Sequence, residues 1–105
     1  HQPIDVLVLG MGDDGHTASL FPGSANLAHA LREDCPERCV ATQAPVAPEA
    51  RLTMTYPLLA CARMQCLAIQ GSEKLETLRV ALSADPLQMP IRAFLHAPLE
   101  IYWCP

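Results

Sequence analysis

The sequence predicts an α/β fold in which a mostly parallel β-sheet is flanked by helices on both faces. Two apolar runs, 4–9 and 64–69, are typical of strands that are buried on both sides of a sheet. Segments with the apolar spacing of helices alternate with the predicted strands, and this alternation favours parallel pairing. Parallel strands end at a common edge of the sheet, where ligands bind in open α/β folds.

The first half of the chain is expected to form two strands and a short helix. The strand 4–9 meets two glycines, which permit the sharp turn that must follow it. Apolar residues at helical spacing then predict a short helix within 24–32. A second strand at 40–43 ends at the proline-rich bend 44–48.

The middle of the chain alternates between polar and apolar residues before a helical segment. Residues 51–55 predict a strand that carries Arg51 and two threonines on one side and two apolar residues on the other. Pro57 suits the first turn of a helix, because that turn needs no backbone N–H from it. The apolar strand 64–69 follows.

The helix that begins near Gly71 has the clearest pattern in the chain. We expect Ser72 to be its N-cap, and its buried stripe to consist of Leu75, Leu78 and Leu82. The helix should end before Asp85-Pro86, since proline does not continue a helix.

The last segment is expected to contain a brief helical turn at 91–95 and a final strand at 101–103. Pro98 and Pro105 bracket this strand, which places it at an edge of the sheet. We expect Tyr102 and Trp103, two aromatic residues of the strand, to lie in the core or in an interface.

Composition narrows the classes of partner. The 105 residues include seven basic and eleven acidic residues, with a net charge of −4 and no basic patch, so we expect no nucleic-acid partner. No apolar run is long enough to span a membrane, and no signal-peptide pattern opens the chain. The chain begins without methionine and enters an apolar strand at once, so we expect missing partners upstream.

The five cysteines favour free thiols in a reducing, cytoplasmic compartment, because their number is odd and they lack the pairing of zinc-binding motifs. Cys35 and Cys39 lie close together in a loop-like region without a second pair of ligands. We therefore expect no metal and no other cofactor.

The glycine-rich stretch after the first strand holds the candidate active site. Its residues 10–15 fit the G-x-G-x-x-G pattern of dinucleotide-binding loops. However, Asp13 and Asp14 would place negative charge beside a pyrophosphate, and Pro22-Gly23 would cut short the long helix that such loops open. Two acids, a histidine and two hydroxyl residues in so short a loop favour catalysis instead.

A family resemblance sharpens this interpretation. Residues 10–23, GMGDDGHTASLFPG, resemble the signature of the 6-phosphogluconolactonases, within a superfamily that also holds the glucosamine-6-phosphate deaminases. Residues 48–55 and 71–74 are similar to later parts of the lactonase pattern. The resemblance runs from about residue 5 to the end and covers the family's second half. It implies that 1–105 is the C-terminal part of one larger three-layer α/β/α domain, whose upstream glycine-rich phosphate loop is absent here.

The implied reaction is the hydrolysis of 6-phospho-D-glucono-1,5-lactone to 6-phosphogluconate in the pentose phosphate pathway. It needs an activated water, stabilisation of the oxyanion and a grip on the phosphate. An imidazole is mostly neutral at cytosolic pH, so His16 is the expected general base. Asp14 is expected to orient it, although an aspartate at this point also commonly caps a turn.

The expected substrate-binding residues are Arg51, Lys74, Gly12 and Gly15. Arg51 offers a planar fork to phosphate oxygens, and Lys74 adds charge near a helix N-terminus. The backbone N–H groups of the glycine turn are candidates for the oxyanion. For Arg51 and Lys74 the alternative is an ordinary surface salt bridge.

Two other functions remain open. The deaminase branch shares the DGH element but continues with an N-E-P type sequence, where this chain has Leu20-Phe21-Pro22 and therefore lacks the glutamate. Alternatively, the chain is a non-catalytic half-domain that needs its upstream half, or self-association, to cover apolar surface.

Overall fold

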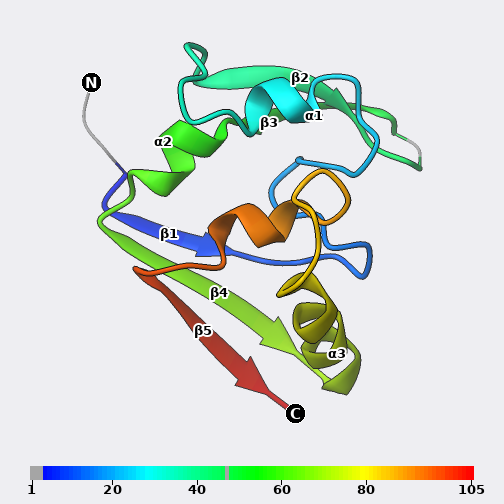
Figure 1. Ribbon diagram of the computed structural model, residues 1–105, viewed down its shortest axis with the longest axis vertical. Helices are drawn as coiled ribbons and strands as arrows, with labels where there is room; N and C mark the ends of the chain where they lie inside the picture. The colour runs from blue at the N-terminus through cyan, green and yellow to red at the C-terminus, as the bar shows by residue number, and fades with distance from the viewer. Residues whose placement is uncertain (1–3, 47) are drawn as a thin grey trace.

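The computed structural model describes residues 4–46 and 48–105, so residue 47 of the predicted bend 44–48 lies outside the described residues (Figure 1). Strands and short helices alternate along the chain. The elements are β1 (Val6–Leu9), α1 (Leu27–Ala30), β2 (Cys39–Gln43), β3 (Ala50–Met54), α2 (Tyr56–Ala60), β4 (Met64–Gln70), α3 (Ser72–Ala81), the 3₁₀ helix η1 (Pro90–Phe94) and β5 (Leu99–Cys104). Each predicted strand and helix is present within a few residues of its expected place.

The main sheet is parallel and has the strand order β1-β4-β5. Figure 1 shows these three strands fanned out side by side, with the termini of β4 and β5 pointing the same way. Strands β2 and β3 form a separate antiparallel pair, in which Cys39 lies opposite Met54. The prediction of a mostly parallel sheet flanked by helices, with the last strand at an edge, is confirmed.

The core lies between one face of the parallel sheet and the helices. Leu67 of β4, Ile91 and Phe94 of η1 and Leu20 of the loop after β1 are fully or almost fully buried in it. Leu78 and Ala81 of α3 pack into the same cluster. All the helices therefore contribute to one core on one side of the sheet.

The opposite face of the sheet is bare in the part of the chain that the structure describes. Val6 and Val8 of β1 are 57% and 64% exposed, and Met64 of β4 is 48% exposed. The predictions that β1 and β4 are buried on both sides and that helices cover both faces of the sheet therefore do not hold for the described residues. An apolar run indicates that a strand can be buried on both faces, but it does not indicate which segment packs against each face. Tyr102 and Trp103 are likewise exposed rather than in the core.

Two details of α3 differ from prediction. Gly71, with φ +92°, is the N-cap, and Ser72 is the first residue of the helix rather than its cap; among the residues that the structure describes, no side chain caps this helix. Leu82 is 55% exposed, because the chain leaves the helix after Ala81, and Ala81 takes the buried place that was expected for Leu82.

The loop after β1 does not open a long helix, which removes the dinucleotide alternative. Residues 17–26 form turns and a single bridge between Thr17 and Leu20, and α1 then has only four residues. All five cysteines are free, as predicted. Among the described residues, no helix has the length and apolar character needed to cross a membrane.

Candidate active site

The candidate site is built on the loop that follows β1 at the carboxyl edge of the parallel sheet. The Gly12 N–H donates to the His16 carbonyl at 2.9 Å, and the Gly15 N–H donates to the Gly12 carbonyl at 3.0 Å. These bonds close residues 12–16 into a tight turn, which Gly15 completes with φ +84°. The turn fixes the backbone on which the His16 side chain is mounted.

Both glycines are needed for steric reasons. A Cβ on Gly12 would overlap the His16 ring and approach Asp14 Oδ1 to 2.9 Å. A Cβ on Gly15 would meet Met89 at 2.8 Å, and the positive φ would strain any other residue. Since the N–H groups of Gly12 and Gly15 already donate within the loop, these two glycines shape the site rather than offer free donors.

Asp14 holds the imidazole of His16 in place. Its Oδ1 lies 2.6 Å from His16 Nδ1 and also accepts the His16 backbone N–H at 3.0 Å. An ionised carboxylate only accepts hydrogen bonds, so Nδ1 is the donor in this contact, and in the neutral ring the lone pair is on Nε2. Asp14 Oδ1 thus does both things that the sequence suggested: its contact with Nδ1 orients the His16 ring, and its bond to the His16 N–H caps the turn.

The charge state of Asp14 follows from the same contacts. Partial burial raises the pKa of Asp14, but the hydrogen bonds from the His16 backbone and ring, together with the charge attraction, outweigh it. The net result is a pKa below the ordinary 3.8. Asp14 is therefore ionised at neutral pH and able to stabilise a positive charge on the ring.

Phe21 joins His16 to Arg51. The centroids of the His16 and Phe21 rings are 4.7 Å apart, and Arg51 Cζ lies 5.6 Å from the centroid of the Phe21 ring. The imidazole and the guanidinium are thus separated by no more than the sum of those two distances. Arg51 uses its Nε to donate to the Pro48 carbonyl, at 3.1 Å. The sequence singled out Phe21 only as part of the segment that lacks the deaminase glutamate, and did not predict this contact.

Lys74 reaches the same loop from the first turns of α3. Its Nζ donates to the Met11 carbonyl and pairs with Asp13 Oδ1, each at 2.9 Å. The contact follows from topology, since β1 and β4 are parallel neighbours and the loop and α3 leave the same edge. Lys74 thus joins the site, though it contacts Asp13 and the backbone rather than the His16 ring.

Three buried threonines fasten the far end of the loop. Thr17 donates to the Gly10 carbonyl at 2.7 Å. Thr42 of β2 donates to the Ser19 carbonyl at 2.8 Å, and the Ser19 N–H donates to Thr53 Oγ1 of β3 at 3.2 Å. The hairpin that carries Arg51 is therefore tied to the loop that carries His16. The alternation of β3 is confirmed, and its polar side faces inward, whereas Leu52 is 76% exposed.

A hollow of about 320 Å³ opens beside the imidazole. Its lining residues are Gly10, Met11, Gly12, His16, Thr17 and Ala18. This volume is at the low end of the range for ligand sites, about 300 to 1,000 Å³. Arg51 lines a different hollow of about 470 Å³ between the hairpin and residues 24–26. His16 and Arg51 thus line separate hollows, and Arg51 lies at the margin of the candidate site.

Comparisons with known proteins agree with these features. The sequence matches, over residues 1–103, the family described as glucosamine-6-phosphate isomerases/6-phosphogluconolactonase. It is 61% identical to a 6-phosphogluconolactonase of Pseudomonas putida and 57% identical to one of Pseudomonas aeruginosa. Each alignment covers 98% of this chain but only 43% and 44% of the relative.

Solved structures give the same picture. A crystal structure of a 6-phosphogluconolactonase from Shewanella baltica superposes with a TM-score of 0.91 and 41% identity, covering 100% of this chain and 46% of that one. A putative 6-phosphogluconolactonase from Neisseria gonorrhoeae gives a TM-score of 0.89 at 32% identity. The chain therefore spans about half the length of the curated relatives it matches.

Proposed function

Because the chain belongs to the glucosamine-6-phosphate isomerase/6-phosphogluconolactonase family, we propose that it carries the catalytic base of a 6-phosphogluconolactonase. The reaction is the hydrolysis of 6-phospho-D-glucono-1,5-lactone to 6-phosphogluconate. The observation that carries the proposal is the 2.6 Å contact between Asp14 Oδ1 and His16 Nδ1, which makes Nε2 the nitrogen available as a base on a neutral ring that lines an open hollow.

The proposed mechanism uses His16 first as a base and then as an acid. Nε2 takes a proton from a water molecule as the water oxygen attacks the lactone carbonyl carbon. When the tetrahedral intermediate collapses, the bond to the ring oxygen breaks, and the imidazolium returns the proton to that oxygen. The ionised Asp14 stabilises the imidazolium between these steps. General-base assistance of this kind contributes roughly 10² to 10⁴ in rate.

We propose that Arg51 and Lys74 bind the dianionic phosphate of the substrate. Arg51 donates one hydrogen bond from Nε to the Pro48 carbonyl. Its two terminal nitrogens can then donate to two oxygens of a phosphate. Lys74 brings its charge to the loop, where two of its three N–H groups have protein acceptors. We propose that Lys74 combines long-range attraction of the phosphate with clamping of the loop. Gly12 contributes by leaving room for the His16 ring, and Gly15 contributes by allowing the positive φ of the turn and the close approach of Met89.

We also propose that the chain is the C-terminal part of a single larger domain. The relatives are about twice as long as the chain, and the bare face of β1, β4 and β5 is apolar. Cover for that face and further phosphate donors would come from the remainder of the family domain. The five free thiols fit a reducing compartment, and we propose a cytoplasmic location.

The test measures acid release from freshly prepared 6-phosphogluconolactone at constant pH, with spontaneous hydrolysis subtracted. The chain is assayed alone and after mixing with the upstream half of the Pseudomonas putida relative. We expect activity in the mixture and its loss, by about 10² or more, with His16→Ala. His96→Ala is the matched control, because His96 is exposed and hydrogen-bonded to Tyr56 rather than to the loop.

Full activity of the His16→Ala mixture would refute the base assignment. Activity of the mixture that does not exceed that of the upstream half by itself would show that this chain contributes no chemistry. It would then support the alternative of a half-domain whose role is association.

A further inference from the structure

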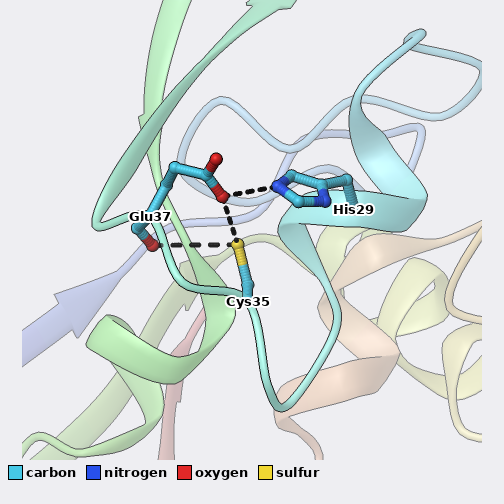
Figure 2. A group of neighbouring side chains, drawn as sticks. All are labelled: His29, Cys35 and Glu37. Carbon is cyan, nitrogen blue, oxygen red and sulfur yellow. Dashed lines mark hydrogen bonds and ion pairs between the residues drawn. The ribbon is translucent and has the colours of Figure 1, made fainter.

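Three side chains of types that can ligate a metal converge outside the candidate active site, as Figure 2 shows. They are His29 on α1, Cys35 in the loop that follows α1, and Glu37 shortly before β2. One donor atom from each lies within 4.8 Å of the other two. His29 Nε2 is 2.6 Å from Glu37 Oε1, and Cys35 Sγ is 3.5 Å from the same oxygen. We will call these three residues the His-Cys-Glu cluster.

We propose that the His-Cys-Glu cluster binds one divalent ion of the zinc type, with a water molecule in the fourth position. Imidazole nitrogen, thiolate sulfur and carboxylate oxygen are the three ligand types that Zn²⁺ takes from proteins. A tetrahedral ion with bonds of about 2.0 to 2.3 Å separates its ligand atoms by about 3.3 to 3.8 Å. The 3.5 Å between sulfur and carboxylate oxygen already has this value.

Small movements complete the geometry. Nε2 and Oε1, now joined by a hydrogen bond, must move apart to admit the ion between them, and the exposed Glu37 side chain is free enough to do so. Burial fixes the position of the Cys35 thiol, because this residue is only 8% exposed. Its neighbours Pro36 and Glu37 are exposed. The buried sulfur thus faces the two other donors and provides the anchor of the site.

Binding of the ion is a reversible exchange of the metal for protons. The Cys35 thiol loses its hydrogen, the hydrogen between the His29 imidazole and the Glu37 carboxylate is also displaced, and both are released to solvent as protons. No change in oxidation state is involved, because zinc has no redox chemistry under these conditions. The cluster shares no residue with the loop 10–16, so the bound ion has no part in the proposed hydrolysis.

The expected consequence is structural. The ion would tie α1 to the segment that enters β2, where the Glu37 carbonyl also accepts the Thr55 hydroxyl at 2.7 Å and the Arg38 carbonyl accepts the Thr55 N–H at 3.0 Å. Those contacts hold the start of α2. A loaded site should therefore raise the free energy of unfolding of the chain with the logarithm of ion concentration, once that concentration exceeds Kd.

The test uses the full chain, stripped of metal with a chelator and kept reduced. Co²⁺ is titrated in as a spectroscopic probe and then displaced with Zn²⁺, while calorimetry with Zn²⁺ gives the stoichiometry. We expect one ion per chain, a sulfur-to-cobalt charge-transfer band, and proton release into a weak buffer. Cys35→Ser should abolish the band, and His29→Gln and Glu37→Gln should each weaken affinity at least tenfold. Cys39→Ser, at an exposed thiol four residues away, is the matched control.

Circular dichroism of each variant shows whether it has folded, and the two glutamine variants keep the test valid if Cys35→Ser does not fold. No sulfur-to-cobalt band, or a stoichiometry below one half, would overturn the proposal. So would binding that survives all three substitutions or is lost with Cys39→Ser. In those cases the cluster is a hydrogen-bonded staple of the loop between α1 and β2.

Discussion

Replacing Asp14 by asparagine tests the central contact of the candidate site. The variant keeps the size of the side chain but removes the charge that faces His16 Nδ1 at 2.6 Å. A hydrogen bond to a charged group is worth about 1.5 to 3 kcal/mol, which corresponds to about 10- to 100-fold in rate. The Asp14 side chain is 40% exposed, and solvent screening favours the lower half of that range.

We therefore expect kcat to fall by about tenfold or somewhat more, with little change in KM, because Asp14 acts on the ring rather than on the substrate. The assay is acid release from 6-phosphogluconolactone by the mixture of this chain with the upstream half of a relative. Asp34→Asn is the matched control, since Asp34 pairs with Arg32 outside the loop and is 73% exposed. Equal kcat values for the wild type and Asp14→Asn, or an equal loss in Asp34→Asn, would refute this reasoning.

Three further predictions concern the glycine turn, the phosphate and pH. Gly12→Ala should lower activity by about 10² by displacing the imidazole that a Cβ overlaps, whereas Gly10→Ala, which adds a methyl group to the lining of the hollow but overlaps no protein atom, should lower activity less than Gly12→Ala does. Arg51→Lys should raise KM for the phosphorylated lactone about tenfold and leave hydrolysis of unphosphorylated gluconolactone unchanged, whereas Arg63→Lys should affect neither. The folded pKa of Asp14 is depressed, so its contribution to stability is present above the ordinary value of 3.8 and is lost as pH falls through the folded value. Urea unfolding should therefore show wild type more stable than Asp14→Asn at pH 7, with the gap closing as pH is lowered below 3.8; a gap that stays constant would contradict the ion pair.

The sequence predicted the elements of the fold because their signals are local. Glycines after an apolar run mark the loop that carries His16, and a proline marks the first turn of α2. Asp14 and His16 are two residues apart, so their contact was within reach of the same local reasoning. Where a prediction failed locally, as at Ser72 and Leu82, the error was one of helix boundaries, which pattern alone places only approximately.

The parts of the site that sequence reasoning missed depend on contacts between distant residues. Ser19 meets Thr53 across 34 positions, and Lys74 meets Met11 across 63. Thr53 looked like one polar residue of an alternating strand, and nothing in that pattern indicated that its hydroxyl would accept a loop N–H. Phe21 lies between the imidazole of His16 and the guanidinium of Arg51 because the β2–β3 hairpin packs against the loop. That packing is part of the tertiary structure and has no local signal in the sequence.

The bare face of the parallel sheet leads to a last prediction. Fully burying a valine side chain stabilises an association by about 1.5 kcal/mol or more, whereas burying an unpaired ammonium opposes it. Val8→Lys should therefore leave the chain folded, because Val8 is 64% exposed, but should weaken its productive association with the upstream half at least tenfold.

The measurement is the concentration of upstream half that restores half-maximal lactonase activity. Val80→Lys is the matched control, since Val80 is 53% exposed on α3, away from the bare face. If both variants need the same concentration as the wild type, the face around Val8 is not covered in the active protein. If only Val8→Lys needs a higher concentration, the exposed face of β1 is covered by the upstream half in the active protein. The apolar sequence of β1, which predicted burial on both sides, then describes the larger domain correctly.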